Sequence, residues 1–173
     1  MEPEIRRATP EDAMLVALLG RITFRETFGH LFADHRDELR AYLDLIFDVG
    51  KIGRSVGASE NAYWLAFVAG LPVGYAKLKH PSAPTDQGDQ NAVQLQKIYV
   101  LQEFLGQRIG AGLLYHVIRE AKRLAPLLWL DVLRENERAI TFYRKHGFVG
   151  IGEQTYDIGS QRFLFHLMAR QTT

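Results

Sequence analysis

The feature that most constrains the fold is a glycine-spaced turn at residues 107–112 (Gln-Arg-Ile-Gly-Ala-Gly), which joins two segments of different periodicity. Residues 94–100 before it have a strand-like pattern, and residues 113–122 after it repeat apolar side chains at helical spacing. A second apolar run, residues 127–132, follows a proline and indicates a buried strand. This order predicts a right-handed strand-helix-strand crossover whose two strands are roughly parallel.

The turn is also suited to holding phosphates. Four backbone N–H groups in the first turn of a helix have no intrahelical partner, and the macrodipole adds positive charge there. Gly110 and Gly112 lack the Cβ atoms that would block an approaching anion. Taken alone, the same turn is equally compatible with a helix start whose glycines serve only packing.

A second motif occupies residues 136–148. Asn136 is a good N-cap, apolar and aromatic residues follow at intervals of three and four, and Gly147 suits the left-handed position that ends a helix. The spacing predicts a helix over residues 136–146 that is followed by a strand. The motif comprises Asn136, Ala139, Phe142, Tyr143, Lys145, Gly147 and Phe148.

Together the two motifs resemble those of the GCN5-related N-acetyltransferase superfamily, over residues 94–149. Weaker resemblance covers the whole chain and points to the bacterial spermine/spermidine N-acetyltransferase branch, through residues 23–28 and 156–159. The resemblance implies one acetyltransferase domain over residues 1–173, of α/β (α+β) class. Its mixed, mostly antiparallel twisted sheet would have about six or seven strands flanked by about four helices. Acetyl-CoA would enter a split between two central strands as co-substrate, with no metal.

Composition limits the other function classes. The chain has 173 residues and 47% hydrophobic content, enough for one sizeable core. A net charge of +1, with both signs interspersed, favours neither nucleic acid nor a membrane surface as partner. The absence of cysteine excludes disulfides and an acetyl-cysteine intermediate, so transfer would be direct. We find no signal pattern or membrane-length apolar run and expect a cytoplasmic protein.

The remaining elements follow from local patterns. Residues 51–61 have no clear period and are expected to form a loop or a short helix, and residues 80–91 form the longest polar loop. The expected strands cover residues 4–8, 63–68, 73–79, 92–100, 127–132, 148–151 and 162–168, and the expected helices cover 10–29, 34–47, 113–124 and 136–146.

The resemblance assigns roles to residues in the two motifs. The backbone of residues 98–100 would bind the pantetheine arm, with the Val100 N–H facing the thioester carbonyl. Tyr143 would protonate the leaving thiolate or donate a hydrogen bond to it; the alternative is a half-buried packing tyrosine. Arg108 and Lys145 would contact the cofactor or remain solvated. The implied cofactor-binding residues are Ile98, Tyr99, Val100, Gln107, Arg108, Ile109, Gly110, Ala111, Gly112, Asn136, Tyr143 and Lys145.

A general base is harder to assign. Many relatives carry a glutamate near the end of the strand at residues 92–100, where this chain has Gln94 and Gln96. An amide cannot accept the proton of an ammonium group whose pKa is about 10.4. Ordered water is one alternative, and the candidate side chains are Glu26, His30, His80, Asp131 and His166.

The expected reaction is acetyl transfer to a primary amine, a polyamine or another small amine. Phe28 and Glu26 are candidate acceptor contacts, and nearby acidic residues of the helix at 34–47 would attract a polyamine or simply be solvated. The alternatives are transfer to a protein N-terminus or lysine, or a low-turnover acetyl-CoA sensor. Relatives often form dimers, so a homodimer is compatible with the resemblance.

Overall fold

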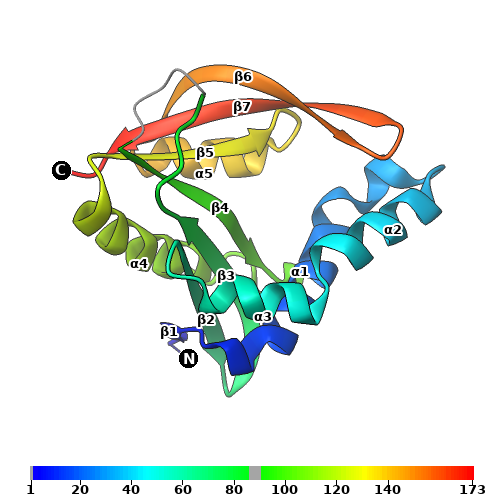
Figure 1. Ribbon diagram of the computed structural model, residues 1–173, viewed down its shortest axis with the longest axis horizontal. Helices are drawn as coiled ribbons and strands as arrows, with labels where there is room; N and C mark the ends of the chain where they lie inside the picture. The colour runs from blue at the N-terminus through cyan, green and yellow to red at the C-terminus, as the bar shows by residue number, and fades with distance from the viewer. Residues whose placement is uncertain (1, 86–90) are drawn as a thin grey trace.

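The computed structural model describes residues 2–85 and 91–173, and within them one seven-stranded sheet has the order β1-β2-β3-β4-β5-β7-β6 (Figure 1). All neighbours pair antiparallel except β4 and β5, which are parallel. This confirms the mixed, mostly antiparallel sheet. The strands are β1 (Glu4–Arg7), β2 (Asn61–Val68), β3 (Leu71–Lys79), β4 (Ala92–Val100), β5 (Leu127–Leu133), β6 (Val149–Ile158) and β7 (Gln161–Gln171).

The described residues form five α-helices, one more than the expected number, because most of the segment at residues 51–61, expected to be a loop or a short helix, lies in α3. An Asp48 side chain that accepts a hydrogen bond from the Lys51 backbone N–H starts this helix. The helices are α1 (Ala13–Phe28), α2 (Arg36–Ile46), α3 (Val49–Gly57), α4 (Ile109–Leu124) and α5 (Glu137–Lys145), with short 3-10 turns η1 (Pro10–Asp12), η2 (Gly29–Phe32) and η3 (Gln102–Phe104).

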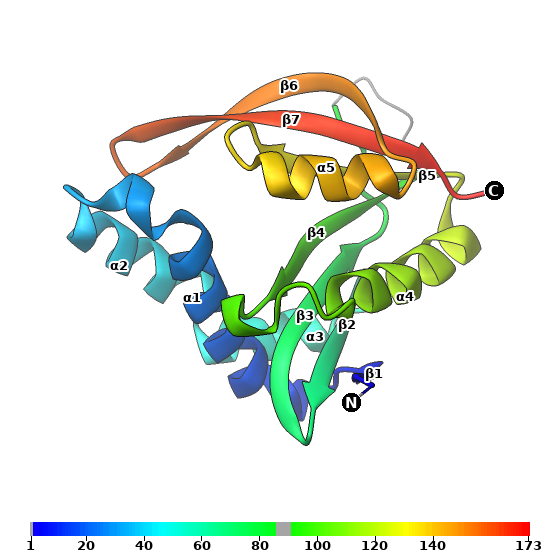
Figure 2. The same cartoon turned by 180° about the vertical axis from the view of Figure 1, so that it is seen from behind.

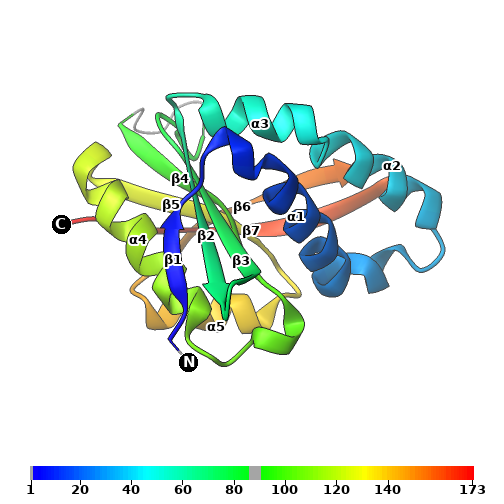
Figure 3. The same ribbon diagram turned by 90° about the horizontal axis from the view of Figure 1, so that it is seen from below.

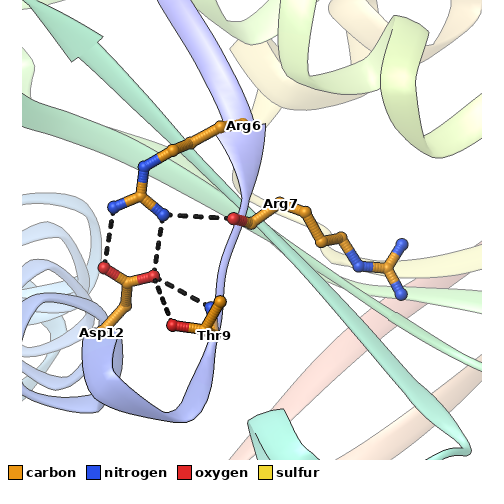
Figure 4. A network of polar contacts seen from close by, with 4 residues as sticks. All are labelled: Arg6, Arg7, Thr9 and Asp12. Carbon is orange, nitrogen blue, oxygen red and sulfur yellow. Dashed lines mark hydrogen bonds and ion pairs between the residues drawn. The ribbon is translucent and has the colours of Figure 1, made fainter.

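A charged cap joins β1 to the first helical segment (Figure 4). The Thr9 backbone N–H donates to the Asp12 carboxylate at 2.9 Å, and the Arg6 guanidinium donates to both Asp12 oxygens at 2.8 Å. Hydrogen bonding from Arg6 is the main cause that lowers the pKa of Asp12 to about 2. The first strand and the first helix are therefore tied together by an ion pair whose carboxylate is buried.

Helices cover both faces of the sheet (Figure 3), and a separate hydrophobic core lies on each face. In β2, Ala62 and Trp64 face the core that includes α4 and α5, and Tyr63 and Leu65 face the core that includes α1, α2 and α3. This alternation is the period of two that a strand imposes on its side chains. Both faces are covered near β2 and β3, so the reactive site must lie elsewhere.

Helix α1 buries a different stripe from the one that its largest apolar residues suggest. Met14 and Leu18 are 67% and 53% exposed, whereas Val16 and Leu19 are buried. Gly20 lies on the buried side against the Phe47 ring, where a Cβ atom would collide with the ring. The glycine that weakens the helix by propensity therefore has a packing reason.

The sheet opens between its two parallel strands (Figure 2). Pairing of β4 with β5 stops after Gln94 and Trp129. In the pairing of β4 with β3, Lys77 is opposite Lys97 but Leu78 is opposite Leu95, so Gln96 is an extra residue in a bulge. The bulge and the divergence leave a gap beside residues 95–100, as the resemblance implied.

The last hairpin is longer than the sequence pattern indicated. Strands β6 and β7 run to Ile158 and Gln171, and their connecting turn reaches α2 (Figure 1). There the Glu38 carboxylate accepts hydrogen bonds from the Ser160 backbone N–H at 2.9 Å and from the Ser160 hydroxyl at 2.8 Å. We call this contact the Glu38–Ser160 clasp. It connects the two sides of the molecule across the outer end of the gap.

Candidate active site

The gap between β4 and β5 leads into one cleft of about 1690 Å³. Its walls come from α1, β4, the start of α4, β5, α5 and the β6–β7 hairpin. Pockets for single small ligands are usually about 300–1,000 Å³. The cleft therefore has room for a long cofactor and an acceptor at the same time.

The start of α4 provides backbone donors at one end of the cleft. Gly106 and Arg108 have left-handed backbone angles, with φ of 84° and 63°. The first helical hydrogen bond runs from the Gly112 N–H to the Arg108 carbonyl at 3.0 Å. The N–H groups of Ile109, Gly110 and Ala111 consequently have no partner within the helix. A left-handed residue followed by a helix start forms a concave set of donors that suits phosphate.

One glycine of this turn acts differently from the prediction. A Cβ atom on Gly112 would lie 2.7 Å from the Cδ1 atom of Ile5, so this glycine lets β1 pack on α4 and does not clear a path for an anion. A Cβ on Gly110 would meet the Phe142 ring at 3.8 Å, an ordinary contact. The prediction that both glycines clear the approach is wrong for Gly112.

Three cations line the cleft near these donors: Arg108, Arg138 and Lys145. Arg138 was missed by the sequence analysis, although it follows the N-cap Asn136 by two residues and so lies in the first turn of α5. Asn136 itself lines the cleft, and its side-chain oxygen accepts a hydrogen bond from the Ala139 N–H at 3.2 Å. Its amide group is therefore both the N-cap and part of the cleft wall.

Of the residues that the resemblance assigned to cofactor binding, most line the cleft and two do not. Those in its wall are Ile98, Tyr99, Val100, Arg108, Ile109, Gly110, Ala111, Asn136, Tyr143 and Lys145. Gln107 and Gly112 lie outside it.

The backbone of β4 presents free polar groups to the gap. The Leu101 N–H donates to the Val73 carbonyl of β3 at 2.8 Å. Because N–H groups alternate between the two edges of a strand, those of Ile98 and Val100 point toward the gap. Tyr99 is paired with Tyr75 of β3, so its ring rather than its backbone reaches the cleft.

Tyr143 lies in the cleft wall on α5 and is 8% exposed. Its ring packs against Phe142 and Phe148 at centroid distances of 5.4 and 5.6 Å. Within residues 2–85 and 91–173 the hydroxyl has no hydrogen-bond partner. Burial raises the pKa of Tyr143 above its ordinary value, so the group stays protonated and can donate a hydrogen bond.

A polar network in the gap ends on Asp131. Its carboxylate accepts hydrogen bonds from the Tyr156 hydroxyl at 2.8 Å and from the Gln94 amide at 3.4 Å. Gln154 donates to the same carboxylate at 3.5 Å and also to the Tyr156 hydroxyl. Burial raises the pKa of Asp131, while the bond from Tyr156 opposes that rise.

The network explains the two glutamines of β4. The side-chain oxygen of Gln94 accepts hydrogen bonds from Ser82 and Gln96, each at 3.1 Å, and its NH₂ group donates to Asp131. The two glutamines therefore connect β4 to a carboxylate of the neighbouring strand, Asp131. A usable signal was present in the sequence, because Asp131 is the charged residue within the otherwise apolar run of β5.

The three histidines that were candidate bases lie outside the cleft wall. His30 belongs to η2, and His80 follows β3. His166 lies on β7 and contacts the Glu153 carboxylate at 3.1 Å. None of the three is placed to take a proton from an amine in the gap.

Phe28 and Glu26 both line the cleft on the α1 side. The Glu26 carboxylate accepts a hydrogen bond from the Gln102 backbone N–H at 3.0 Å, which fixes the chain just after β4. Phe28 lies 4.8 Å from Phe24 and 6.4 Å from Tyr99 between ring centroids. This half of the cleft is thus aromatic, and its acidic side chain already has a structural partner.

Two absences concern the described part of the chain. It contains no group of three or more His, Cys, Asp or Glu side chains arranged to hold a metal ion. No helix in it is both long and apolar enough to cross a membrane.

Comparisons with known proteins agree with this geometry. An uncharacterised N-acetyltransferase of Mycobacterium tuberculosis is 34% identical over 78% of this chain and 83% of its own length. An uncharacterised N-acetyltransferase of Lactobacillus delbrueckii is 24% identical over 92% of this chain and 91% of its own. The crystal structure of PaiA N-acetyltransferase from Thermoplasma acidophilum, in complex with coenzyme A, has a TM-score of 0.79 at 21% identity, covering 99% of both chains.

The model of the acetyltransferase (GNAT) family matches residues 21–148. This span contains the gap, the glycine-spaced turn and the helix that carries Tyr143. The chain therefore belongs to the acetyltransferase (GNAT) family and is an acetyl-CoA-dependent N-acetyltransferase.

Proposed function

We propose that the enzyme acetylates the primary amine of a small molecule by direct attack on acetyl-CoA, with Asp131 as proton acceptor and polyamines as the first acceptor class to test. The observation that carries the proposal is the position of Asp131. Its carboxylate lies in the gap beyond the last β4–β5 pair, with the free backbone edge of β4 opposite and Tyr143 in the same cleft wall.

The roles of the residues follow from the chemistry. The amine must lose a proton, and Asp131 accepts it directly or through water, a task that its raised pKa favours. The amine nitrogen then bonds to the thioester carbon, and the Val100 N–H donates to the oxyanion, an interaction that is typically worth about 3 kcal/mol. When the carbon–sulfur bond breaks, the Tyr143 hydroxyl stabilises the thiolate.

Two observations support a small cationic acceptor. Aromatic rings line the α1 side of the cleft, and rings attract ammonium groups. Glu153 and Asp157 of β6 also line the cleft, but their carboxylates are already paired with His166 and Arg162. The Glu38–Ser160 clasp bridges the outer end of this half, which favours a small molecule over the surface of a folded protein.

The test is thiol release from acetyl-CoA by the purified protein, with spermidine, spermine, simple amines, amino acids and short peptides as acceptors. We expect turnover with a polyamine. Asp131→Asn should lower kcat/KM by roughly 10²–10⁴ at unchanged acetyl-CoA affinity, whereas Tyr143→Phe should lower kcat mainly. Turnover only with peptides would replace the acceptor assignment. Tight acetyl-CoA binding without release by any amine would reject the proposal and favour a sensor.

Two further features of the protein stay predictions. The resemblance suggests a homodimer, which sedimentation of the purified protein would test. A cytoplasmic location is the expectation from the sequence, and fractionation of cells that express the tagged chain would test it.

A further inference from the structure

Lys97 is a charged residue of the cleft that the mechanism above does not use. It lies on β4 directly beyond the Gln96 bulge, opposite Lys77 of β3, and it lines the cleft. Among residues 2–85 and 91–173, no carboxylate approaches its ammonium group within ion-pair distance. An enclosed lysine without a direct partner is costly, because burial lowers its pKa.

The residue across the gap from Lys97 is Asp131. The parallel register stops at Gln94 and Trp129, so the residues that follow on the two strands face each other across open space. Asp131 follows Trp129 by two residues and Lys97 follows Gln94 by three, one of which is the bulge. The negative charge of Asp131 opposes the fall in the pKa of Lys97, and the positive charge of Lys97 opposes the rise in the pKa of Asp131. The space between the two strands is therefore bounded by one cation and one carboxylate.

We propose that Lys97 is a positioning charge for the reaction: held at the gap as an ammonium, it disfavours a second ammonium beside Asp131 and promotes loss of the acceptor's proton. This inference rests on the proposed function. Without Lys97, an incoming ammonium and Asp131 would form a stable ion pair, and a protonated nitrogen has no lone pair with which to attack the thioester. With Lys97 present, the ammonium has a repulsive neighbour. Because Lys97 also lowers the pKa of Asp131, its contribution is a larger fraction of neutral amine and not a stronger base.

The other ionisable groups around Lys97 and Asp131 do not cancel the positive charge of Lys97. Burial raises the pKa of each neighbouring tyrosine, so these hydroxyls remain neutral. Burial lowers the pKa of Lys77 to about 8, and this residue adds a second positive charge at neutral pH. The groups that act on Lys97 or Asp131 from the surrounding elements are Lys77 on β3, Tyr42 on α2, Tyr99 on β4, Tyr143 on α5 and Tyr156 on β6, while His166 on β7 pairs with Glu153 of β6.

The experiment compares pH profiles of kcat at saturating acceptor for the wild type, Lys97→Met, Lys97→Arg and the control Lys122→Met, an exposed lysine on α4. Removing a positive charge makes a nearby proton harder to lose. Lys97→Met should therefore move the rising limb of the kcat profile to a pH that is higher by roughly one unit. Lys97→Arg should leave the limb at the wild-type pH, because arginine remains charged. Lys122→Met should match the wild type.

Two results in this assay would overturn the proposal. A lower kcat at every pH, with no displacement of the limb in Lys97→Met, would mean that Lys97 acts only in packing. Equal loss of activity in Lys97→Arg and Lys97→Met, with folding intact, would mean that Lys97 itself accepts the proton, since arginine cannot.

A second measurement is independent of turnover. The carboxyl ¹³C resonance of Asp131, identified by its absence in Asp131→Asn, is followed against pH in the protein without acceptor. Its midpoint should rise in Lys97→Met and stay in place in Lys97→Arg; an unchanged midpoint in Lys97→Met would reject the proposal. If no amine is acetylated but the midpoint rises, the acceptor assignment fails while the electrostatic role of Lys97 stands.

Discussion

The ion pair between Arg6 and Asp12 should contribute to the free energy of unfolding by an amount that follows from the pKa of Asp12. The pKa of Asp12 falls from 3.8 to about 2 on folding, and each pKa unit corresponds to about 1.4 kcal/mol, so the upper limit is about 2.5 kcal/mol. The Arg6 side chain is 41% exposed, and solvent screening reduces the contribution. We expect Asp12→Asn to lower the free energy of unfolding at pH 7 by about 1–2 kcal/mol.

The sign of the pH dependence follows from the direction of the shift. A carboxylate whose pKa is lowered by folding stabilises the native state above its unfolded pKa, and the contribution disappears as the pH falls toward 2. Urea unfolding of the wild type and Asp12→Asn between pH 7 and pH 2 should show a constant difference above about pH 5 that vanishes near pH 2.

The neighbouring Glu11 provides a matched control, because it is exposed and makes no ion pair within the described residues. Glu11→Gln should leave the free energy of unfolding within about 0.5 kcal/mol of the wild type at each pH. A difference between the wild type and Asp12→Asn that persists unchanged at pH 2 would show that the loss comes from packing or from the cap and not from ionisation. That result would refute the reasoning.

Two other predictions concern the walls of the cleft. A Cβ on Gly74 would lie 2.8 Å from the Tyr99 carbonyl oxygen, so Gly74→Ala should lower the free energy of unfolding in urea by roughly 1–3 kcal/mol and weaken acetyl-CoA binding. The control Gly150→Ala, whose Cβ would have no atom within 4 Å, should lower it by less than about 0.5 kcal/mol. Equal losses in the two variants would contradict the contact between Gly74 and Tyr99. Glu38→Gln weakens the Glu38–Ser160 clasp and should raise the KM for the acceptor without changing the affinity for acetyl-CoA. The control Asp37→Asn changes an exposed residue and should leave both quantities unchanged. Loss of acetyl-CoA affinity in Glu38→Gln would mean that the clasp does not belong to the acceptor side of the cleft.

Local patterns were sufficient for most elements. The strand that became β4 was predicted with its observed bounds, and α5 with its Asn136 cap was predicted to within a residue at each end. These elements are specified by residues close together in the chain, through capping, periodicity and turn chemistry. The β6–β7 hairpin was predicted too short, because β6 is an edge strand with mostly exposed side chains and lacks the apolar alternation that marks a half-buried strand.

The glycine-spaced turn at residues 107–112 depends on both local and distant residues. The glycine spacing indicated the correct location, because free N–H groups belong to any helix start. It did not indicate that Gly112 accommodates Ile5 from β1, a contact between residues far apart in the sequence. Nor did it show that Gly106 and Arg108 take the left-handed angles that shape the turn.

Local patterns along the chain were enough to predict the crossover unit, the helix start that suits phosphate, and the family to which the two motifs belong, since each depends on neighbours within a few turns. The choice of a candidate carboxylate required the folded structure. Asp131 became the candidate, ahead of four other residues, when β4 and β5 diverged and left it facing Lys97 across open space. The proton affinity of a side chain depends on burial and on charges brought close by folding, and no local pattern in the chain records that proximity.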